Sequence, residues 1–183
     1  MINGNQMLEV ILNRQSDRSY TGKPVEKDKI ERMISAARMA PSACNAQPWK
    51  FIVVNEPELL IQLAEASSAK LLGMNQFVNQ APLMIVVVRE SANITSRFGG
   101  VVKAKDYSLI DIGIATENIC LQATAEGLGS CILGWFDEKR VRKILSVPGS
   151  KRVELILTIG YPAKGTREKK RKPENETVSY NKY

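Results

Sequence analysis

An unbroken apolar run from Leu83 to Val88 directly follows Pro82, and it is the strongest constraint on how this chain can fold. Successive side chains of a β-strand point to opposite faces of the sheet, so a wholly apolar run suits a strand that is buried on both faces. Other elements must then cover both sides of this strand. The run is far too short to cross a bilayer.

Two helices have clear apolar patterns. In residues 26–39, Ile30, Met33, Ile34 and Ala37 recur at helical spacing, and Pro41 ends the pattern. Residues 106–126 are apolar around most of a helix, so we expect this segment at the centre of the fold or at a subunit interface. We expect helices at 5–13, 26–39, 56–66, 106–126 and 137–145, and strands at 49–54, 83–88, 128–133 and 153–159.

The order of these elements predicts an α+β fold with one mixed sheet flanked by helices. The sequence contains no internal repeat and no linker, so residues 1–183 are expected to form a single domain. Residues 91–105 have no clear period and are predicted to form a loop, which could serve as a lid or only connect two elements.

Composition excludes several kinds of chemistry. The chain has 183 residues, 44% of them hydrophobic, which is enough for an apolar core. It has no histidine, which removes Ser-His and Cys-His catalysis, and its three cysteines, Cys44, Cys120 and Cys131, lack metal-ligand spacing. The first residues do not resemble a signal peptide, so we expect a cytoplasmic protein without membrane attachment.

The net charge of +7 is concentrated near the C-terminus. Residues 164–172 contain six basic residues and a single acid, Glu168. Such a run can be a solvated tail or a surface for nucleic acid. Few aromatic residues accompany these charges, which argues against a platform for stacking bases.

Three stretches could carry chemistry, although each has a simpler interpretation. The stretch "RQSDRSY", residues 14–20, spaces two arginines around a serine, but a surface arginine pair is common. The stretch "APSACNAQPW", residues 40–49, combines small side chains with amides and could equally be a turn between a helix and a strand. The stretch "REKKRKP", residues 167–173, could be only a solvated tail.

Taken together and in order, these stretches resemble the nitroreductase family of FMN-dependent oxidoreductases. The resemblance rests on five motifs and spans almost the whole chain. They are Arg-x-Ser-x-Arg at 14–18, Pro-Ser-x-x-Asn-x-Gln-Pro-Trp at 41–49, Gly-Leu-Gly at 127–129, Gly-Tyr-Pro at 160–162 and the basic cluster before Pro173. The resemblance implies the nitroreductase-like fold, with a mixed, mainly antiparallel central sheet flanked by helices, an intertwined homodimer, bound FMN, and NADH or NADPH as electron donor.

The resemblance also implies residue roles. Arg14 and Ser16 would hold the FMN phosphate together with Lys169 and Arg171 from the basic cluster, and Arg18 would reach the ribityl chain and pyrimidine edge. Gln15 stands where the family often has a second basic residue, so a neutral hydrogen bond is expected there.

Two further segments would approach the flavin ring. In the loop at 41–47, Cys44 is expected to be only a small neutral filler, and Trp135 could narrow the entrance for substrate. The loop residues expected at the ring of the partner subunit are Pro41, Ser42, Ala43 and Asn45, with Gln47 supporting the loop, and Ile132, Leu133 and Gly134 would offer backbone groups near flavin N5.

The expected activity is reduction of nitroaromatics, quinones or similar electron-poor small molecules by ping-pong hydride transfer through flavin N5. No protein side chain is required as a catalytic acid or base. Alternatives are a flavin-binding or storage protein without turnover, a dehalogenase-like member of the same fold, a member that destroys flavin to make a vitamin B12 base, and a nucleic-acid binder that uses residues 164–172.

Overall fold

The computed structural model describes residues 3–68, 74–90 and 106–183, so the loop expected at 91–105 lies outside them. Within these ranges every expected helix and strand is present, and each end lies within one residue of its expected position. Short 3-10 helices at Ala43–Asn45 (η1), Gln76–Gln80 (η3) and Glu174–Glu176 (η4) were not expected.

Four strands form one sheet with the order β1-β2-β4-β3. All three pairings are antiparallel, and a parallel contact occurs only as an isolated bridge between Ser16 and Ser130 among the described residues. The expected α+β class is therefore confirmed, with the parallel part of the mixed sheet reduced to that bridge. The strands are β1 (Trp49–Val54), β2 (Leu83–Arg89), β3 (Gly129–Leu133) and β4 (Arg152–Gly160).

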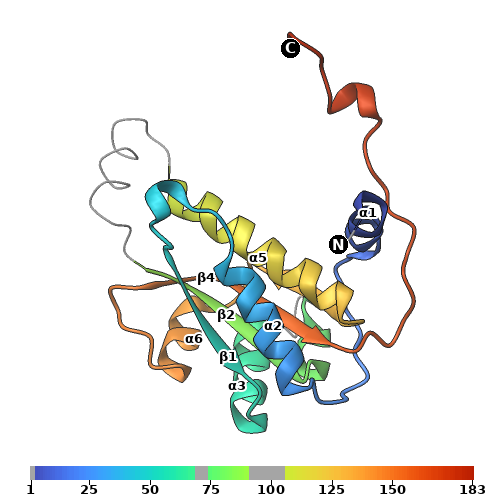
Figure 1. Ribbon diagram of the computed structural model, residues 1–183. Coiled ribbons are helices and arrows are strands. Elements are labelled where there is room, and N and C mark those ends of the chain that lie inside the picture. The colour runs from blue at the N-terminus through green and yellow to red at the C-terminus, as the bar shows by residue number, and fades with distance from the viewer. Residues whose placement is uncertain (1–2, 69–73, 91–105) are drawn as a thin grey trace.

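Helices cover both faces of the sheet, as the apolar run in β2 required (Figure 1). Leu83, Ile85 and Val87 belong to one buried cluster, with side chains of α2 (Lys27–Arg38) and α5 (Tyr107–Ala125). Met84, Val86 and Val88 belong to a second cluster, with α3 (Pro57–Ser67) and α6 (Glu138–Ile144). Successive side chains of β2 point to opposite faces of the sheet, so they pack alternately in two separate cores.

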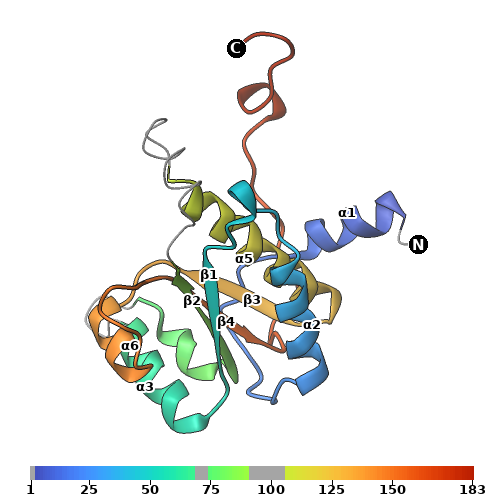
Figure 2. The same cartoon turned by 60° about the vertical axis from the view of Figure 1, so that its left-hand side comes forward.

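The long helix α5 is central, as expected, but part of its surface remains uncovered. Ile112, Ala115 and Ile119 are buried in the core, whereas Leu109, Ile110 and Ile114 are exposed. The first helix, α1 (Gly4–Asn13), contacts α5, contains no buried residue and projects from the body in Figure 2. Its exposed apolar side chains, Met7, Leu8, Ile11 and Leu12, add to the uncovered apolar surface of the chain.

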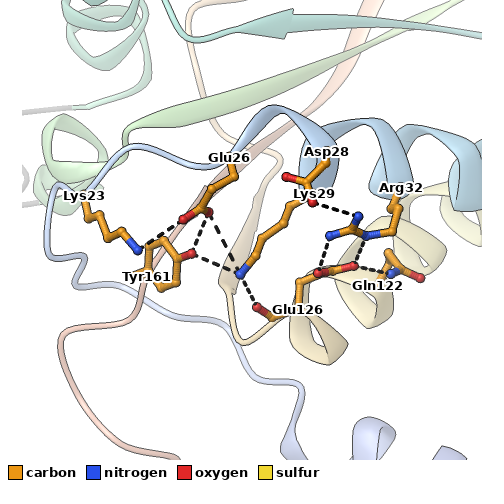
Figure 3. Close-up of polar contacts among 8 residues, drawn as sticks. All are labelled: Lys23, Glu26, Asp28, Lys29, Arg32, Gln122, Glu126 and Tyr161. Atoms are coloured by element: carbon orange, nitrogen blue, oxygen red, sulfur yellow. Dashed lines mark hydrogen bonds and ion pairs between the residues drawn. The ribbon is translucent and has the colours of Figure 1, made fainter.

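A polar network joins the start of α2 to the end of α5 (Figure 3). The Tyr161 hydroxyl donates to Glu26 Oε2 at 2.6 Å and accepts from Lys29 Nζ at 3.0 Å. Lys29 also donates to the carbonyl of Glu126, the C-cap of α5, and Arg32 donates twice to the Glu126 carboxylate. The network fixes α2, α5 and the segment after β4 relative to one another.

Beyond Tyr161, the chain leaves the sheet and runs past α1 before it projects from the body at the C-terminus (Figures 1 and 2). From Ala163 onward every residue except Lys169 is exposed. No helix within the described ranges is long and apolar enough to span a membrane.

Candidate functional site

The 14–18 turn lies along the outer edge of β3. Ser16 forms the parallel bridge with Ser130, and the backbone N–H of Asp17 donates to the Ser130 carbonyl at 2.9 Å. The buried Tyr20 hydroxyl also holds the turn in place, because it donates to the Asp17 carbonyl at 2.9 Å. Because β3 is an edge strand, this short segment extends the sheet by one contact and holds its own side chains at the edge.

The basic cluster of the C-terminal tail packs against this turn. Together the two segments line one cavity of about 350 Å³. Arg14 and Ser16 therefore lie in the same cavity as Lys169 and Arg171, although the two pairs come from opposite ends of the chain. The cavity is lined by Arg14, Gln15, Ser16, Arg18, Arg167, Glu168, Lys169, Lys170 and Arg171.

The charges in this cavity favour an anion. Its lining includes six basic side chains and one acidic side chain, Glu168. Burial lowers the pKa of Lys169, and the nearby positive charges of Arg14 and Arg171 lower it further. A bound anion would reverse this mutual repulsion, since each cation would then face an opposite charge.

Arg14 has a buried hydrogen-bond donor that no described residue accepts from. Its side chain is 26% exposed, and its Nε lies 3.2 Å from Glu117 Oε1 in an ion pair. The Nε atom is nevertheless buried without a hydrogen-bond acceptor among the described residues, because the ion pair lacks hydrogen-bond geometry. Arg14 as a residue lines the cationic cavity, where its guanidinium suits a phosphate oxygen.

Gln15 connects the turn to the tail. Its Nε2 donates to Asp17 Oδ1 at 2.8 Å and to the Gly165 carbonyl at 3.3 Å, and its Oε1 accepts from the Arg167 backbone at 3.0 Å. Arg167 also donates through Nη2 to the Ser16 carbonyl at 2.7 Å. Burial raises the pKa of Asp17, while the hydrogen bond from Gln15 and the charge of Arg167 oppose that rise.

The 41–47 loop is held at the start of α5, away from the cavity. The Asp111 carboxylate accepts from the backbone N–H of Ala43, and Ser42 Oγ accepts from that of Gln47 at 3.0 Å. Gln47 Nε2 donates to the Asn45 carbonyl at 3.2 Å, within the same loop. Three non-glycine residues here, Cys44, Asn45 and Gln47, have positive φ, a strained conformation that often occurs at binding sites.

Residues 132–134 comprise the end of β3 and the residue after it, beyond Ser130, where the 14–18 turn contacts the strand. Leu133 is buried, whereas Ile132 and Gly134 are exposed. Because β4 pairs with only one side of β3, the backbone of this segment lies at the open edge of the sheet, directly after the turn.

Comparison with known proteins identifies the chain. The model of the Nitroreductase family matches residues 11–161, which is most of the sequence. The chain belongs to the nitroreductase family. This confirms the resemblance drawn from the five motifs.

Relatives within the nitroreductase family share both sequence and fold with this chain. A protein of Archaeoglobus fulgidus is 34% identical over 161 residues, which cover 86% of each chain. The solved structure of an FMN-dependent nitroreductase from Clostridium difficile R20291 has a TM-score of 0.76 and 31% identity, with 96% of this chain and 99% of that chain covered. An FMN reductase (NADPH) of Bacillus subtilis is 25% identical, with 98% of this chain and 75% of the relative covered.

Family membership confirms the expected nitroreductase fold and the expected enzyme class, an FMN-dependent NAD(P)H oxidoreductase. The chain brings together the expected phosphate residues, Arg14, Ser16, Lys169 and Arg171, with Arg18 in the same cavity. It does not bring the 41–47 loop into that cavity.

Sequence reasoning missed three residues that shape the site. Arg167 was not distinguished from the other basic residues of its run, because nothing in the sequence indicates which of them contacts the turn. Asp17 and Asp111 were also missed, although both have a signal in the sequence. Asp17 stands between Arg14 and Arg18, and Asp111 is an acidic residue within a mainly apolar helix.

Proposed function

We propose that this member of the nitroreductase family reduces nitroaromatics, quinones or similar electron-poor small molecules with electrons from NADH or NADPH, using FMN. The observation that carries the proposal is the convergence of Arg14 and Ser16 with Lys169 and Arg171 around one cavity. A phosphate group is the anion that this donor set suits best, because arginine can bind it through two parallel hydrogen bonds and lysine can add a point charge.

FMN fits the residues that are present. The positive charges of Arg14, Lys169 and Arg171, which repel one another in the cavity, would each face the negative charge of the phosphate. Ser16, at the edge of β3, would offer its hydroxyl, and Arg18 would reach further along the ligand. Gly134 and Ile132 follow the turn along the same edge, where their backbone groups would meet the flavin ring.

The protein supplies binding and orientation rather than an acid or a base. When bound, FMN would supply the redox chemistry, by which two electrons from NADH or NADPH would reach the acceptor in separate half-reactions. A positive charge at Arg18 near the pyrimidine edge would stabilise the negative charge of reduced flavin. Trp135, which is exposed beside Gly134, would limit the size of molecules that reach the ring.

We propose further that the active species is a homodimer whose flavin sites lie between two chains. The family resemblance assigns Pro41, Ser42, Ala43 and Asn45 to the flavin ring of the partner, and their absence from the lining of the phosphate cavity is compatible with that assignment. The exposed apolar side chains of α1 and α5 supply a surface for such an interface, and the projecting C-terminal residues 179–183 would wrap around the second copy.

The absorbance of the purified protein, followed by stopped-flow spectroscopy, tests the proposed function. Under anaerobic conditions, NADH or NADPH should bleach the flavin absorbance, and a nitroaromatic or quinone should restore it. Protein that is yellow but is bleached by neither nucleotide would instead be a flavin-storage protein. Colourless protein that binds DNA in a steeply salt-dependent way would make the basic tail a nucleic-acid surface.

A further inference from the structure

Gln15 uses its entire side-chain amide within its own chain. A carboxamide has two N–H donors and an oxygen with two lone pairs. Nε2 donates to Asp17 and to the Gly165 carbonyl, and Oε1 accepts from both the backbone N–H and the Nε of Arg167, the latter at 3.3 Å. Gln15 can therefore reach a phosphate only by giving up one of these contacts.

The contacts of Gln15 run from the sheet to the tail without a break. Asp17, at one end, is 9% exposed and is tied to β3 by its hydrogen bond to Ser130. Its carboxylate also packs on Gly129, where an added Cβ would lie 2.6 Å from Asp17 Oδ2. At the other end, Arg167 is held by Gln15 and by the Ser16 carbonyl.

A neutral side chain suits this place. The cavity wall already holds six basic groups against one acidic group, so like charges oppose the approach of the tail. An acidic residue at position 15 would neutralise one of the charges meant for the anion. A basic residue would repel Arg167. An amide can hold the tail in place and leave the charge of the cavity unchanged.

We propose that Gln15 is a positioning residue that, with Asp17 and Arg167, forms a tail clamp. The tail clamp holds residues 165–171 on the 14–18 turn, so that Lys169 and Arg171 face Arg14 before an anion binds. Its purpose rests on the FMN site proposed above, because a tail that is already ordered lowers the entropic cost of binding the phosphate. The clamp itself exists whether or not that ligand is FMN.

Limited trypsin digestion tests the tail clamp, because residues 164–172 are rich in cleavage sites. The full-length chain, stripped of flavin, is digested as wild type, Gln15→Ala and Arg167→Lys, and early cleavage within 164–172 is followed by mass spectrometry. Loss of the clamp should speed cleavage about tenfold, the equivalent of losing one or two net hydrogen bonds. Gln62→Ala, on the exposed face of α3, serves as the control and should leave the rate unchanged.

Arg167→Lys keeps the charge and the cleavage site but lacks the planar guanidinium, and its exposed position spares the core. Faster cleavage in both variants supports the tail clamp, and wild-type rates in both overturn it. In a second experiment, the wild-type protein is digested with FMN present, which should slow cleavage. If riboflavin, which lacks the phosphate, protects as well as FMN, the proposed phosphate site is wrong, while the rates without flavin still decide the clamp.

Discussion

Arg14 and Arg171 line the same cavity, although they lie near opposite ends of the sequence. Arg14 is fixed by the turn at the edge of β3 and pairs with Glu117 of α5. Arg171 reaches the cavity from an exposed tail that is attached to the turn through Gln15 and Arg167. The site therefore combines one rigid half with one half whose position depends on a few polar contacts.

Replacing Arg14 with alanine should weaken FMN binding by about 1.5 to 3 kcal/mol, the usual worth of a hydrogen bond to a charged group. Riboflavin lacks the phosphate, so its affinity should change far less. Titrating the flavin-free protein with FMN and with riboflavin measures the two affinities. The control is Lys139→Ala on the exposed face of α6, which also removes one positive charge. An equal loss for both flavins would place Arg14 away from the phosphate.

Mixed dimers should reveal whether each flavin site is shared between chains. A chain with Arg14→Ala and Arg171→Ala has a defective phosphate half, and a chain with Asn45→Ala has a defective loop. In a heterodimer of the two, one site combines both intact halves and the other combines both defective halves. Separately tagged chains, expressed together and purified through both tags, should recover about half of the wild-type flavin per dimer.

Such recovery is not expected if the site lies within one chain, because each subunit of the heterodimer would then retain its own defect. The two parent homodimers, purified in the same way, give the baseline for flavin content. A heterodimer that retains no more flavin than its parents would contradict the shared site.

Gly129→Ala should destabilise the fold by about 1 to 3 kcal/mol, the typical cost of an overpacked site. The new Cβ would lie 2.6 Å from Asp17 Oδ2 and 2.7 Å from Asp17 Cγ, so the turn or the strand would have to shift. Urea unfolding measures the loss. Gly149→Ala, where a Cβ would meet no atom within 4 Å, is the control and should retain wild-type stability.

The stability of the protein should fall in acid partly because of Glu26. The Tyr161 hydroxyl, with further help from the backbone and Lys23, lowers the pKa of Glu26 from 4.5 to about 2 (Figure 3). A carboxylate with a depressed pKa stabilises the fold above its unfolded pKa, and this contribution is lost as pH falls through the folded value. The loss should therefore occur between about pH 4.5 and about pH 2.

Glu26→Gln should remove this part of the pH dependence, so the difference in unfolding free energy between wild type and variant should shrink as pH falls through that window. Urea midpoints at several pH values measure it. Glu31→Gln provides a control on the same helix, because Glu31 is exposed and pairs only loosely with Lys27 at 3.6 Å. A constant difference between wild type and Glu26→Gln across the window would contradict the assignment.

Local patterns were enough to predict the α-helices and strands of the described residues, although not the short 3-10 helices. The apolar run at 83–88 became β2 with two buried faces, and the spacing of Ile30, Met33 and Ala37 placed α2. These features follow from the burial of neighbouring side chains, which leaves a periodic signal in the sequence.

The site could be predicted only through the resemblance. The contact between Gln15 and Arg167 joins distant segments by hydrogen bonds that follow no period, and Arg167 stands among five other basic residues. The positive φ angles at Cys44 and Gln47 also lacked a signal, because no glycine marks them.

A crystal structure of the FMN complex would show directly whether the cavity between the 14–18 turn and the tail binds the flavin phosphate. We expect the flavin phosphate within hydrogen-bond distance of Arg14 and Arg171 of one chain, with the 41–47 loop of a second chain against the ring. A phosphate bound elsewhere, with this cavity free of the ligand, would contradict this expectation.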